Sequence, residues 1–411
     1  MSRIENLIKE KCPNGVEYLE LYKVIKWNKK FSGVNKEWQL QTIVIKTDVS
    51  SQELKSLNLY SGDIKLLSTG YFDGYTDSSI YTGLVDDLEV ITIPSGGRAN
   101  IKYYNGKFIN SGNIIGTSID SNKFYLKYIY YCLLNKNDLI QSYFRGSSVQ
   151  HPDMKQIIRI RIPIPPLEIQ KEIANLLDKF GELEAELEAE LEAELEARNR
   201  QYEFWRGKLL ENSNNKVKFG NIATILRGSS PRPIQNFITN DVNGIPWIKI
   251  GDTNPNDKYV FRTKEKINVE GSKKSRYVKS GDFILSNSMS FGRPYILKID
   301  GCIHDGWLSI SNFEDFYISD FLYHLLSSKT IQDMMKRKAS IGTVKNLNAD
   351  IVKSIELPVY KKLEQKEIIK VLDKFEKLTN SITEGIPAEI KLRRQQYEYY
   401  RNKLLSFKEL K

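Results

Sequence analysis

The sequence repeats itself at an offset of 195 residues. The segment QKEIANLLDKF at 170–180 returns as QKEIIKVLDKF at 365–375, and QYEFWRGKLL at 201–210 returns as QYEYYRNKLL at 396–405. In these two windows 15 of 21 residues are identical to the residue 195 positions later. A long-period repeat of this kind in a chain of 411 residues predicts two copies of one structural unit.

Two dissimilar stretches, roughly 15–165 and 215–360, precede the matching segments. Only sparse positions in them keep the offset: Asp87 with Asp282, Gly97-Arg98 with Gly292-Arg293, Val149 with Val344, and Pro163 with Pro358. Each copy is therefore a variable head followed by a similar tail. Two divergent heads on one plan predict one architecture that carries two different surface specificities.

The tails have the pattern of long helices. After Pro165-Pro166, apolar residues recur at helical spacing, and 181–197 then reads GELEAELEAELEAELEA, built from strong helix formers. A helix over 167–210 is about 66 Å long at 1.5 Å per residue, and its leucine spine requires a partner. The second tail keeps that register but carries Gly385 and Pro387, which predict a break or kink near its middle.

The heads have the pattern of mixed α/β domains. Apolar runs at 88–93 and 295–297 predict strands, and 124–143 and 317–336 predict helices. Gly96-Gly97 predicts a turn, and Asn105-Gly106 and Asp300-Gly301 are typical of hairpins. The predicted fold class is α+β: two mixed α/β heads separated by an antiparallel coiled coil of two long helices, with a pseudo-twofold internal repeat. The predicted boundaries are 1–166, 167–211, 212–361 and 362–411.

The charge of the chain indicates an anionic partner. The formal net charge is +10, from 61 basic and 51 acidic residues, and removing the eight Glu of 181–197 leaves the rest at +18. Nucleic acid is the usual partner of such a basic surface. The three cysteines, Cys12, Cys132 and Cys302, show no metal or disulfide spacing, and no apolar run is long enough for a signal or a membrane span. We expect a soluble cytoplasmic protein that does not associate with membranes.

Several segments together resemble the DNA specificity subunits of Type I restriction-modification systems. PIPPLEIQKEIANLLDKF and LPVYKKLEQKEIIKVLDKF resemble the stretch that follows each target-recognition domain, and GIPAEIKLRRQQYEYYRNKLL at 385–405 resembles the distal conserved region. CPNGVEYLEL at 12–21, GDFILSNSMSFGRPYIL at 281–297 and the LEAE tetrapeptide repeat are also similar to the family. The resemblance covers essentially the whole chain and is most specific in the tails.

The resemblance implies a function and a set of partners. A subunit of this family is a non-catalytic sequence reader that recognises a bipartite double-stranded DNA site. It recruits two adenine-methyltransferase subunits and, through them, motor-nuclease subunits. S-adenosylmethionine, ATP and magnesium are then expected in the partner subunits, with no cofactor in this chain.

The motifs in the chain agree with a non-catalytic role. There is no GxxxxGK[ST] phosphate loop and no Asn-Pro-Pro-Tyr type element. The three histidines, His151, His304 and His324, lack ligand-like spacing. The Asp-x-Lys fragments at 63–65 and 153–155 do not by themselves provide the converging carboxylates that a nuclease metal needs. We therefore predict no catalytic residue and no metal site.

Each head offers a Gly-Arg turn and a polar, basic loop as a DNA-reading surface. Lys and Arg bind phosphates, Arg pairs with guanine and Asn or Gln pairs with adenine. The alternative is that the Gly-Arg pairs are ordinary turns and the loops are solvated connectors. The candidates for DNA contact in head 1 are Arg98, Lys102, Arg145, Ser148, Gln150 and His151, and those in head 2 are Arg293, Lys336, Arg337, Lys338, Thr343, Lys345 and Asn346.

The aromatic ends of the tails have two interpretations. Tyr202, Trp205, Tyr397 and Tyr400 either pack tail against tail or dock the methyltransferase subunits, and both can hold. Two other functions compete with the family role. One is a stand-alone DNA-binding regulator with two heads, and the other is a coiled-coil scaffold without a nucleic-acid role. Salt-dependent DNA affinity separates the scaffold from both DNA-binding functions.

Overall fold

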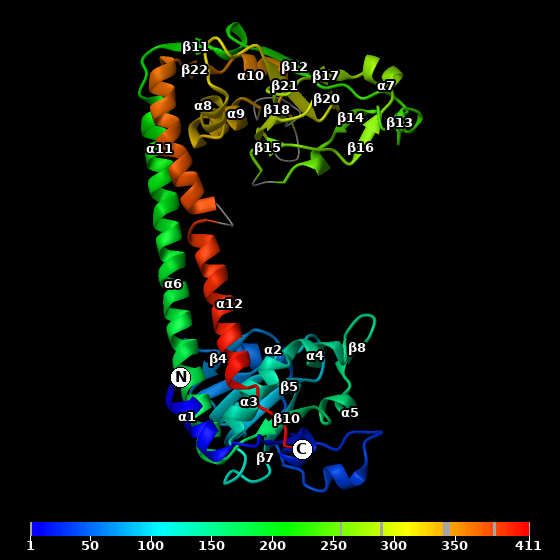
Figure 1. The fold of residues 1–411 in the computed structure, drawn as a ribbon, viewed down its shortest axis with the longest axis vertical. Helices are drawn as coiled ribbons and strands as arrows, with labels where there is room; N and C mark the ends of the chain where they lie inside the picture. Colours follow the sequence, from blue (N-terminus) through cyan, green and yellow to red (C-terminus); the bar gives the residue numbers. More distant parts are fainter. Residues whose placement is uncertain (1, 255–256, 288–290, 340–345, 381–383, 411) are drawn as a thin grey trace. The chain divides into compact units, whose positions relative to one another are not determined.

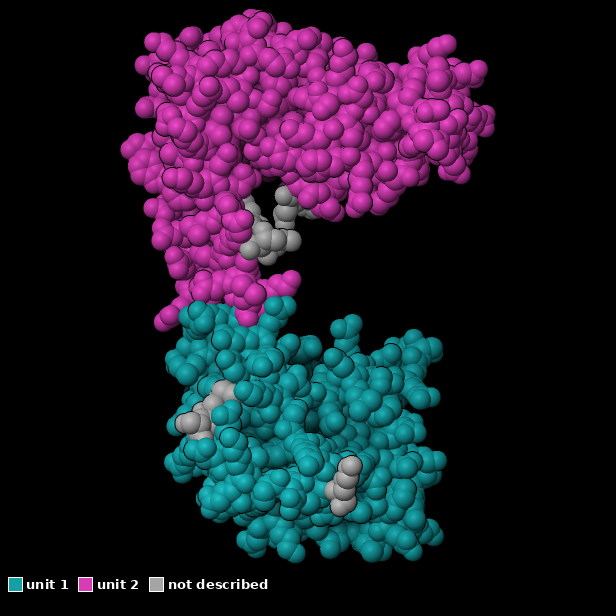
Figure 2. Space-filling model, in the orientation of Figure 1, with its two compact units in different colours: residues 1–187, 393–411 teal, residues 188–392 magenta. Residues whose placement is uncertain are grey.

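The computed structural model describes residues 2–254, 257–287, 291–339, 346–380 and 384–410. The chain forms two compact units, residues 1–187 with 393–411 and residues 188–392 (Figure 2). Unit 1 contains head 1 and unit 2 contains head 2. Each unit also holds part of both tails, so the tails are shared between the units.

The head of unit 1 is an α/β domain built on one large sheet (Figure 1). Its elements are α1 (Ser2–Lys11), β1 (Glu17–Glu20), β2 (Ile25–Trp27), α2 (Ser51–Ser56), β3 (Ile64–Leu67), β4 (Asp73–Thr76), β5 (Asp86–Pro94), β6 (Lys102–Asn110), β7 (Asn113–Ser118), α3 (Leu126–Asn135), α4 (Asn137–Ser142), β8 (Phe144–Arg145), β9 (His151–Pro152), α5 (Met154–Ile157) and β10 (Arg161–Ile164). The large sheet has the order β2-β7-β5-β6-β3-β4, with β3 and β6 parallel and its other pairs antiparallel.

The head of unit 2 has the same plan with an added sheet. Its elements are β11 (Lys216–Lys218), β12 (Thr224–Arg227), β13 (Ile238–Thr239), β14 (Ile245–Ile248), β15 (Tyr259–Val260), β16 (Glu265–Ile267), α7 (Val269–Lys273), β17 (Arg276–Val278), β18 (Phe283–Ser286), β19 (Pro294–Leu297), β20 (Gly301–Ile303), β21 (Trp307–Ser311), α8 (Ser319–Leu326), α9 (Lys329–Ala339), α10 (Ala349–Lys353) and β22 (Glu356–Pro358).

The sheets show that the repeat extends through the dissimilar heads. In unit 2 the order β12-β21-β18-β19-β15 reproduces β2-β7-β5-β6-β3 strand for strand, including the one parallel pair. In both heads the first strand pairs antiparallel with the last, β1 with β10 and β11 with β22. The second sheet of unit 2, β13-β16-β14-β20-β17, has no counterpart among the described strands of unit 1.

The tails are helices, as the sequence predicts. The first tail is α6 (Leu167–Glu211), and the second is α11 (Lys362–Asn380) followed by α12 (Ile386–Leu404). In unit 1 the beginning of α6 packs against the end of α12, with Phe180 and Tyr400 rings 6.2 Å apart. In unit 2 the end of α6 packs against α11, with Tyr202 and Phe375 rings 6.0 Å apart. The prediction that the two tails lie against each other is confirmed, and both pairings are antiparallel.

The leucine spine is less continuous than its spacing suggests. Leu191 is 8% exposed, but Leu183 is 60% exposed. Four residues advance an α-helix by about 400°, so residues spaced by four rotate about 40° per step around the helix. A strict four-residue repeat therefore cannot keep every leucine on one buried face.

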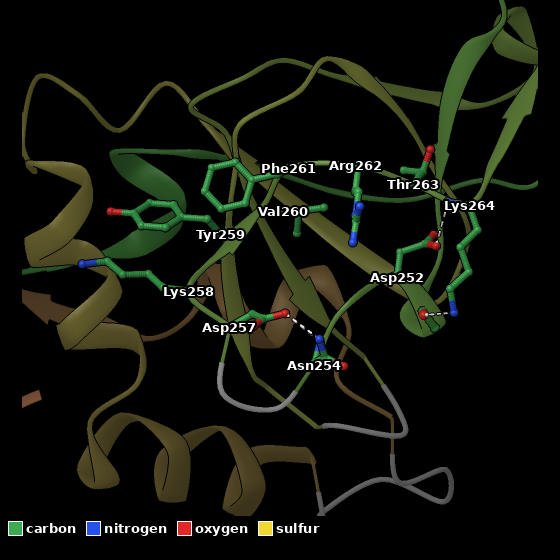
Figure 3. Close-up of a pocket in the computed structure, with 11 residues that line it drawn as sticks. Asp252, Asn254, Asp257, Lys258, Tyr259, Val260, Phe261, Arg262, Thr263 and Lys264 are labelled. Atoms are coloured by element: carbon green, nitrogen blue, oxygen red, sulfur yellow. Dashed lines mark hydrogen bonds between the residues drawn. The ribbon is translucent and has the colours of Figure 1, made fainter. Parts of the chain in front are cut away.

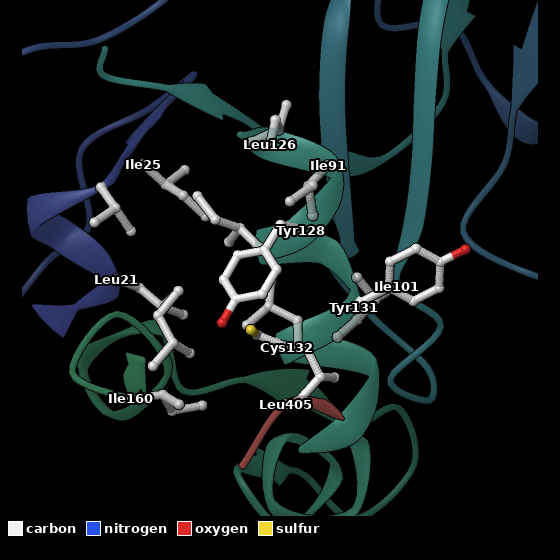
Figure 4. Packing of buried hydrophobic residues seen from close by; sticks show 14 of the residues in the cluster. Leu21, Ile25, Ile91, Ile101, Leu126, Tyr128, Tyr131, Cys132, Ile160 and Leu405 are labelled. Atoms are coloured by element: carbon white, nitrogen blue, oxygen red, sulfur yellow. The ribbon is translucent and has the colours of Figure 1, made fainter. Parts of the chain in front are cut away.

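A buried core joins the head of unit 1 to both tails (Figure 4). Tyr128 and Cys132 of α3 are buried at its centre, and Leu405 from the far end of the chain is also buried there. The segment that follows α12 lies beside the start of the head, where Val16 N–H donates to Lys408 O at 2.8 Å. Both ends of the described chain thus contribute to unit 1.

One buried glutamine in each tail fixes its head by identical bonding. In unit 1 the Gln170 amide accepts from Tyr125 N–H at 2.8 Å and donates to Lys123 O and Pro165 O at 2.9 and 2.8 Å. In unit 2 Gln365 accepts from the N–H of Ile318 at 2.8 Å and donates to the carbonyls of Phe316 and Tyr360 at 2.7 and 2.9 Å. Each amide satisfies three backbone groups away from water.

The hairpin signals were wrong in two places. Strand β6 runs straight through Asn105-Gly106, because both residues pair with β5 and Gly106 accommodates a φ of +133° within the strand. Asp300-Gly301 connects β19 to β20, which belong to different sheets, so no hairpin forms there. The predicted turn at Gly96-Gly97 does join two paired strands, β5 and β6.

The three cysteines are free and buried. Among the described residues, no helix combines the length and the apolar character that crossing a bilayer requires.

Candidate nucleic-acid interface

The structure brings the Gly-Arg turn and the polar loop of head 1 together. Gly97, in the turn between β5 and β6, has a φ of +101° and donates its N–H to Gln150 O at 2.8 Å. The loop runs from β8 to β9, which pair to form a short hairpin. Arg98, Arg145, Ser148, Gln150 and His151 are all exposed on this combined surface. We call these five residues the head 1 loop surface.

The head 1 loop surface is held in place by polar contacts. Gln141 of α4 accepts from Ala99 N–H at 2.8 Å and donates to the Gln150 side chain at 3.2 Å. His151 Nδ1 lies 2.7 Å from Ser95 O, and because a carbonyl oxygen only accepts, Nδ1 carries the proton. The backbone carbonyl of Ser95 therefore orients this imidazole, and Nε2 is its other polar atom.

Lys102 is used differently from the rest of the predicted set. Its Nζ donates to Ser68 O at 3.0 Å and Phe72 O at 3.2 Å, and the side chain is only partly exposed. The ammonium therefore ties β6 to the loop between β3 and β4. Its predicted contact with DNA stays a prediction, and its established contacts are structural.

In head 2 the Gly-Arg turn packs against helix α9. Gly292, between β18 and β19, has a φ of +73°, and its carbonyl accepts from Gln332 at 2.7 Å. The predicted basic residues Lys336, Arg337 and Lys338 form an exposed last turn of that helix. Arg293 and Lys336 line one depression of about 480 Å³ together with Tyr202 and Arg206 of α6. A glutamine therefore fixes the Gly-Arg turn in both heads: Gln141 of α4, the helix after α3, in head 1, and Gln332 of α9, the helix after α8, in head 2.

The remaining candidates of head 2 lie elsewhere. Thr343 and Lys345 are outside the described residues. Exposed Asn346 lines a second depression of about 560 Å³ with Arg227 and Lys249, at the ends of β12 and β14. The structure therefore places Arg293 and Asn346 in separate depressions, unlike the single surface of head 1.

The depression around Asn346 is organised by the turn at 304–306. The Asp305 carboxylate accepts from Ser230 Oγ at 2.9 Å, and this bond holds the pKa of Asp305 below its ordinary value. Burial lowers the pKa of His304, and its ring nitrogens Nε2 and Nδ1 lie 3.2 Å from Ile250 N and 2.6 Å from Gly306 N. The Arg227 guanidinium reaches Asp305 O at 3.3 Å.

Sequence reasoning missed a basic stretch of head 2. A third depression of about 550 Å³, shown in Figure 3, is lined by residues of 251–254 and 257–264, and Arg262 lies between Val260 and Asp252 in that view. Lys264 Nζ donates a hydrogen bond to Gly251 O at 3.1 Å. The sequence signal available for this stretch is the density of Lys and Arg over 258–266. Arg227, Lys249 and Arg262 are added candidates for phosphate contact.

The tail aromatics divide into interior and outer residues. Tyr202 is buried and donates toward His324 Nδ1 at 3.3 Å, and Tyr397 is partly buried beneath the Arg401 guanidinium, 5.5 Å from its ring. Tyr400 packs on Phe180. Trp205 is partly exposed beside Phe204, which is 62% exposed. Tyr202 and Tyr397 therefore lie in the interior of the tails. Trp205 is partly exposed and remains accessible to a partner.

One group of side chains has the composition of a metal site. Ligand atoms of His324, Asp373 and Glu376 lie within 4.8 Å of one another. His324 Nε2 donates to Asp373 at 2.8 Å and its Nδ1 faces the Tyr202 hydroxyl, so both ring nitrogens already have partners. In unit 1 the same tail position, Asp178, accepts from Tyr131 at 2.6 Å. The group is therefore the unit 2 form of a repeated contact between tail and head.

The His324–Asp373 bond predicts a pH dependence of unit 2. The bond lowers the pKa of Asp373, and Lys258 Nζ at 3.8 Å adds to the effect. A carboxyl whose pKa is lowered by folding stabilises the folded state above its unfolded pKa, and this contribution is lost as pH falls through the folded pKa. We expect Asp373→Asn to lower the free energy of unfolding by less than about 1 kcal/mol at pH 7, because Asp373 is half exposed. The difference should shrink below pH ~4.

Urea unfolding of both proteins between pH 3 and 7 measures this difference. Asp350→Asn, at a carboxyl that is 90% exposed on α10, is the control. A difference between wild type and Asp373→Asn that stays constant down to pH 3 would contradict the argument.

The duplicated plan, with a different exposed basic surface on each head, is typical of a modular binding protein. A family model described as the Type I restriction modification DNA specificity domain matches the chain twice, at residues 28–197 and 212–392. The two matches fall on the two copies of the repeat. The chain therefore belongs to the Type I restriction-modification DNA specificity family.

Known proteins are similar over nearly the whole chain. A putative type I restriction enzyme specificity subunit of Haemophilus influenzae is 30% identical over 396 residues, covering 92% of this chain and 97% of the relative. The specificity subunit of the EcoR124I/EcoR124II type I restriction enzyme of Escherichia coli is 30% identical over 400 residues, covering 92% and 96%. Such subunits are the non-catalytic DNA-recognition components of their complexes, and recognition of DNA is the function of this family.

Solved structures share the fold. A chain from a study of complex assembly and conformational transition in the type I R-M system aligns with a TM-score of 0.66 at 14% identity, covering 96% of this chain and 98% of that one. The HsdS subunit from Thermoanaerobacter tengcongensis aligns with a TM-score of 0.53 at 13% identity, covering 96% of each chain. The predicted fold class is confirmed by this likeness and by the two matches of the family model.

Proposed function

We propose that each head reads one half of a bipartite, asymmetric site in double-stranded DNA, with functional heads at 1–166 and 212–361 and helical tails at 167–211 and 362–411. Head 1 uses the head 1 loop surface, and head 2 uses the end of α9, Arg293 and the segment 343–346. The observation that carries the proposal is the pair of Gly-Arg turns, each fixed by a glutamine on an otherwise divergent head.

The two kinds of contact have different roles in this proposal. Exposed Arg98 and Arg145 are suited to bidentate contact with guanine, and Gln150 to adenine. Lys336, Arg337 and Lys338 at the end of α9 bind backbone phosphates and set the position of head 2 without reading bases. Ser148 and His151 Nε2 contribute single hydrogen bonds.

The proposal includes partner subunits. Two adenine-methyltransferase subunits bind the tails, and motor-nuclease subunits join through them, bringing S-adenosylmethionine, ATP and magnesium. Partly exposed Trp205 and Tyr400 are the candidates for this contact, whereas Tyr202 and Tyr397 support it from inside the tail packing.

Methyladenine mapping tests the proposed function. The chain is co-expressed with its cognate methyltransferase in a host without adenine methylation, and modified sites are mapped across the genome. We expect one split motif, with two specific parts at a fixed gap, which disappears when this chain is omitted. A continuous motif would refute the two-headed reading. A purified chain that forms a specific DNA complex alone, without any methylation in the co-expression, would favour the stand-alone regulator.

A further inference from the structure

In unit 1 the short helix α1 is seated between the two tails. Ile4 is buried, and Leu7 and Ile8 pack partly buried against the same core. Ion pairs join Arg3 to Glu172 of α6 at 2.8 Å, Glu5 to Lys403 of α12 at 3.7 Å, and Lys11 to Glu168 of α6. The seat therefore lies between the first turns of α6 and the last turns of α12.

The internal repeat reproduces this seat in unit 2. At the offset of 195, Lys403 corresponds to Lys208, Glu172 to Glu367 and Glu168 to Leu363. All three of these unit 2 residues line one groove of about 670 Å³, between the last turns of α6 and the first turns of α11. Trp205 and Leu209 add apolar surface to the same groove.

No described segment of unit 2 occupies the groove as α1 occupies its seat. In unit 1 a whole helix precedes β1, but in unit 2 α6 ends at Glu211 and β11 begins at Lys216, which leaves no room for such a helix. Leu363 is consequently 73% exposed. Leu363, Trp205 and Leu209 together give this groove an apolar surface, and an exposed apolar patch whose counterpart is filled is typical of an interaction site.

We propose that the unit 2 groove binds an amphipathic helix from a partner protein, in the pose that α1 takes in unit 1. The helix carries apolar residues at the spacing of Ile4, Leu7 and Ile8 and a basic residue at the position of Arg3, which pairs with Glu367. It carries an acidic residue at the position of Glu5, which pairs with Lys208. Where α1 has Lys11 the partner helix is apolar, because Leu363 replaces the glutamate. The proposal does not depend on DNA reading.

The present contacts of Glu367 and Lys208 are weak enough to be replaced by contacts with a bound helix. Glu367 is paired with Lys370 one turn along α11 at 2.7 Å, and Lys208 Nζ lies 5.2 Å from the Trp205 ring. Exposed contacts of this kind contribute little to stability, so Glu367 and Lys208 can exchange them for charged groups of a bound helix. A helix that buries Leu363 adds apolar contact that the groove lacks.

A second copy of this chain is a less suitable occupant. Its own α1 is held by three ion pairs and a buried Ile4, and would have to leave that seat first. Its Lys11 would then face Leu363 and lose its charged partner. The charge pattern of the groove thus favours a helix from another protein.

A synthetic helix tests the groove directly. The probe is a fluorescein-labelled peptide with the sequence of residues 2–11 and the change Lys11→Leu, titrated with the full chain at low salt and followed by anisotropy. We expect saturable binding that Glu367→Arg weakens at least fivefold. The peptide with Arg3→Glu should recover that affinity on the Glu367→Arg chain, which a merely misfolded variant cannot do. Glu192→Arg, the same charge change at an exposed site of α6, should leave binding unchanged.

Three outcomes would overturn the proposal. They are no saturable binding to the wild-type chain, equal loss in Glu367→Arg and Glu192→Arg, and no recovery by the charge-exchanged peptide. Self-association of the chain that Glu367→Arg abolishes would assign the groove to a second copy instead. Because the probe contains no DNA, the methylation map and the peptide titration can fail independently.

Discussion

Gln170→Met is expected to destabilise unit 1 by about 3–5 kcal/mol, at the upper end of what single substitutions cost. Methionine keeps the length of the side chain but offers no amide. The N–H of Tyr125 and the carbonyls of Lys123 and Pro165 then lose their partner in a site from which water is excluded. An unsatisfied buried polar group costs about 1–3 kcal/mol, so three such groups exceed the loss of an ordinary surface bond.

The repeat supplies the matched experiment. Gln365→Met removes the equivalent three bonds in unit 2, at Ile318, Phe316 and Tyr360. Hydrogen exchange followed by mass spectrometry should show faster exchange around α3 in the first variant and around α8 in the second. Each variant should leave the other unit protected, because each amide bonds only within its own unit.

Two further variants sharpen this result. Gln170→Glu keeps an acceptor for Tyr125 N–H but loses both amide donors and buries a charge, so it should also destabilise unit 1 strongly. Gln396→Met, at an exposed position of α12, should change the free energy of unfolding by less than about 0.5 kcal/mol. The account fails if Gln170→Met unfolds at the same denaturant concentration as Gln396→Met.

The tails could be predicted because their physics is local and repeated. Helix formers, the proline pair before Leu167 and the 195-residue offset all act through neighbouring residues. The break predicted from Gly385 and Pro387 falls between α11, which ends at Asn380, and α12, which begins at Ile386. What the pattern could not show is that Gln170 is buried, because a lone glutamine on a helix is usually solvated.

The heads could be predicted only in outline. Sequence identity between them is sparse, yet five strands of each head pair in the same order and sense. That agreement depends on pairing between strands far apart in the sequence, which no short sequence motif predicts. The anchoring groups are also exchanged between residue types: Asp178 accepts from Tyr131, and its equivalent Asp373 accepts from His324. A hydroxyl in unit 1 and an imidazole in unit 2 donate to the equivalent tail carboxylate. The contact therefore recurs in both units although the donor residue differs.

The structure brings some of the candidate DNA-contact residues together and separates others, for the same reason. Arg98 and the loop at 145–151 lie together because Gly97 N–H bonds to Gln150 O, a contact between segments more than fifty residues apart. Lys102, chosen from the same stretch, points instead at the backbone carbonyls of Ser68 and Phe72. Neighbouring residues of a strand point to opposite faces of the sheet, and the sequence pattern alone does not show which face each side chain takes.

Arg98→Ala and Arg145→Ala are expected to alter recognition of one half of the methylated motif and to leave the other half unchanged. Both side chains are exposed on head 1, and head 2 has its own, separately built surface. Loss of a bidentate contact with guanine costs about 1–3 kcal/mol, which corresponds to a loss of roughly 5- to 150-fold at the base pair concerned. Arg337→Ala on head 2, which removes a proposed phosphate contact, is expected to weaken binding to every site alike and to leave both halves of the motif unchanged.

The salt dependence of DNA binding separates the two kinds of contact. If Arg98 reads a base, Arg98→Ala relaxes one position of one half-site, and methylation extends to sites that differ there. If it binds a phosphate, affinity falls for every sequence alike and the slope of log affinity against log salt drops by about one. Lys123→Ala, which removes an exposed charge beside Asp120, is the control and should change neither quantity. Relaxed specificity in both halves after a change confined to head 1 would show that the heads do not read independently, and the two-headed mechanism would then be wrong.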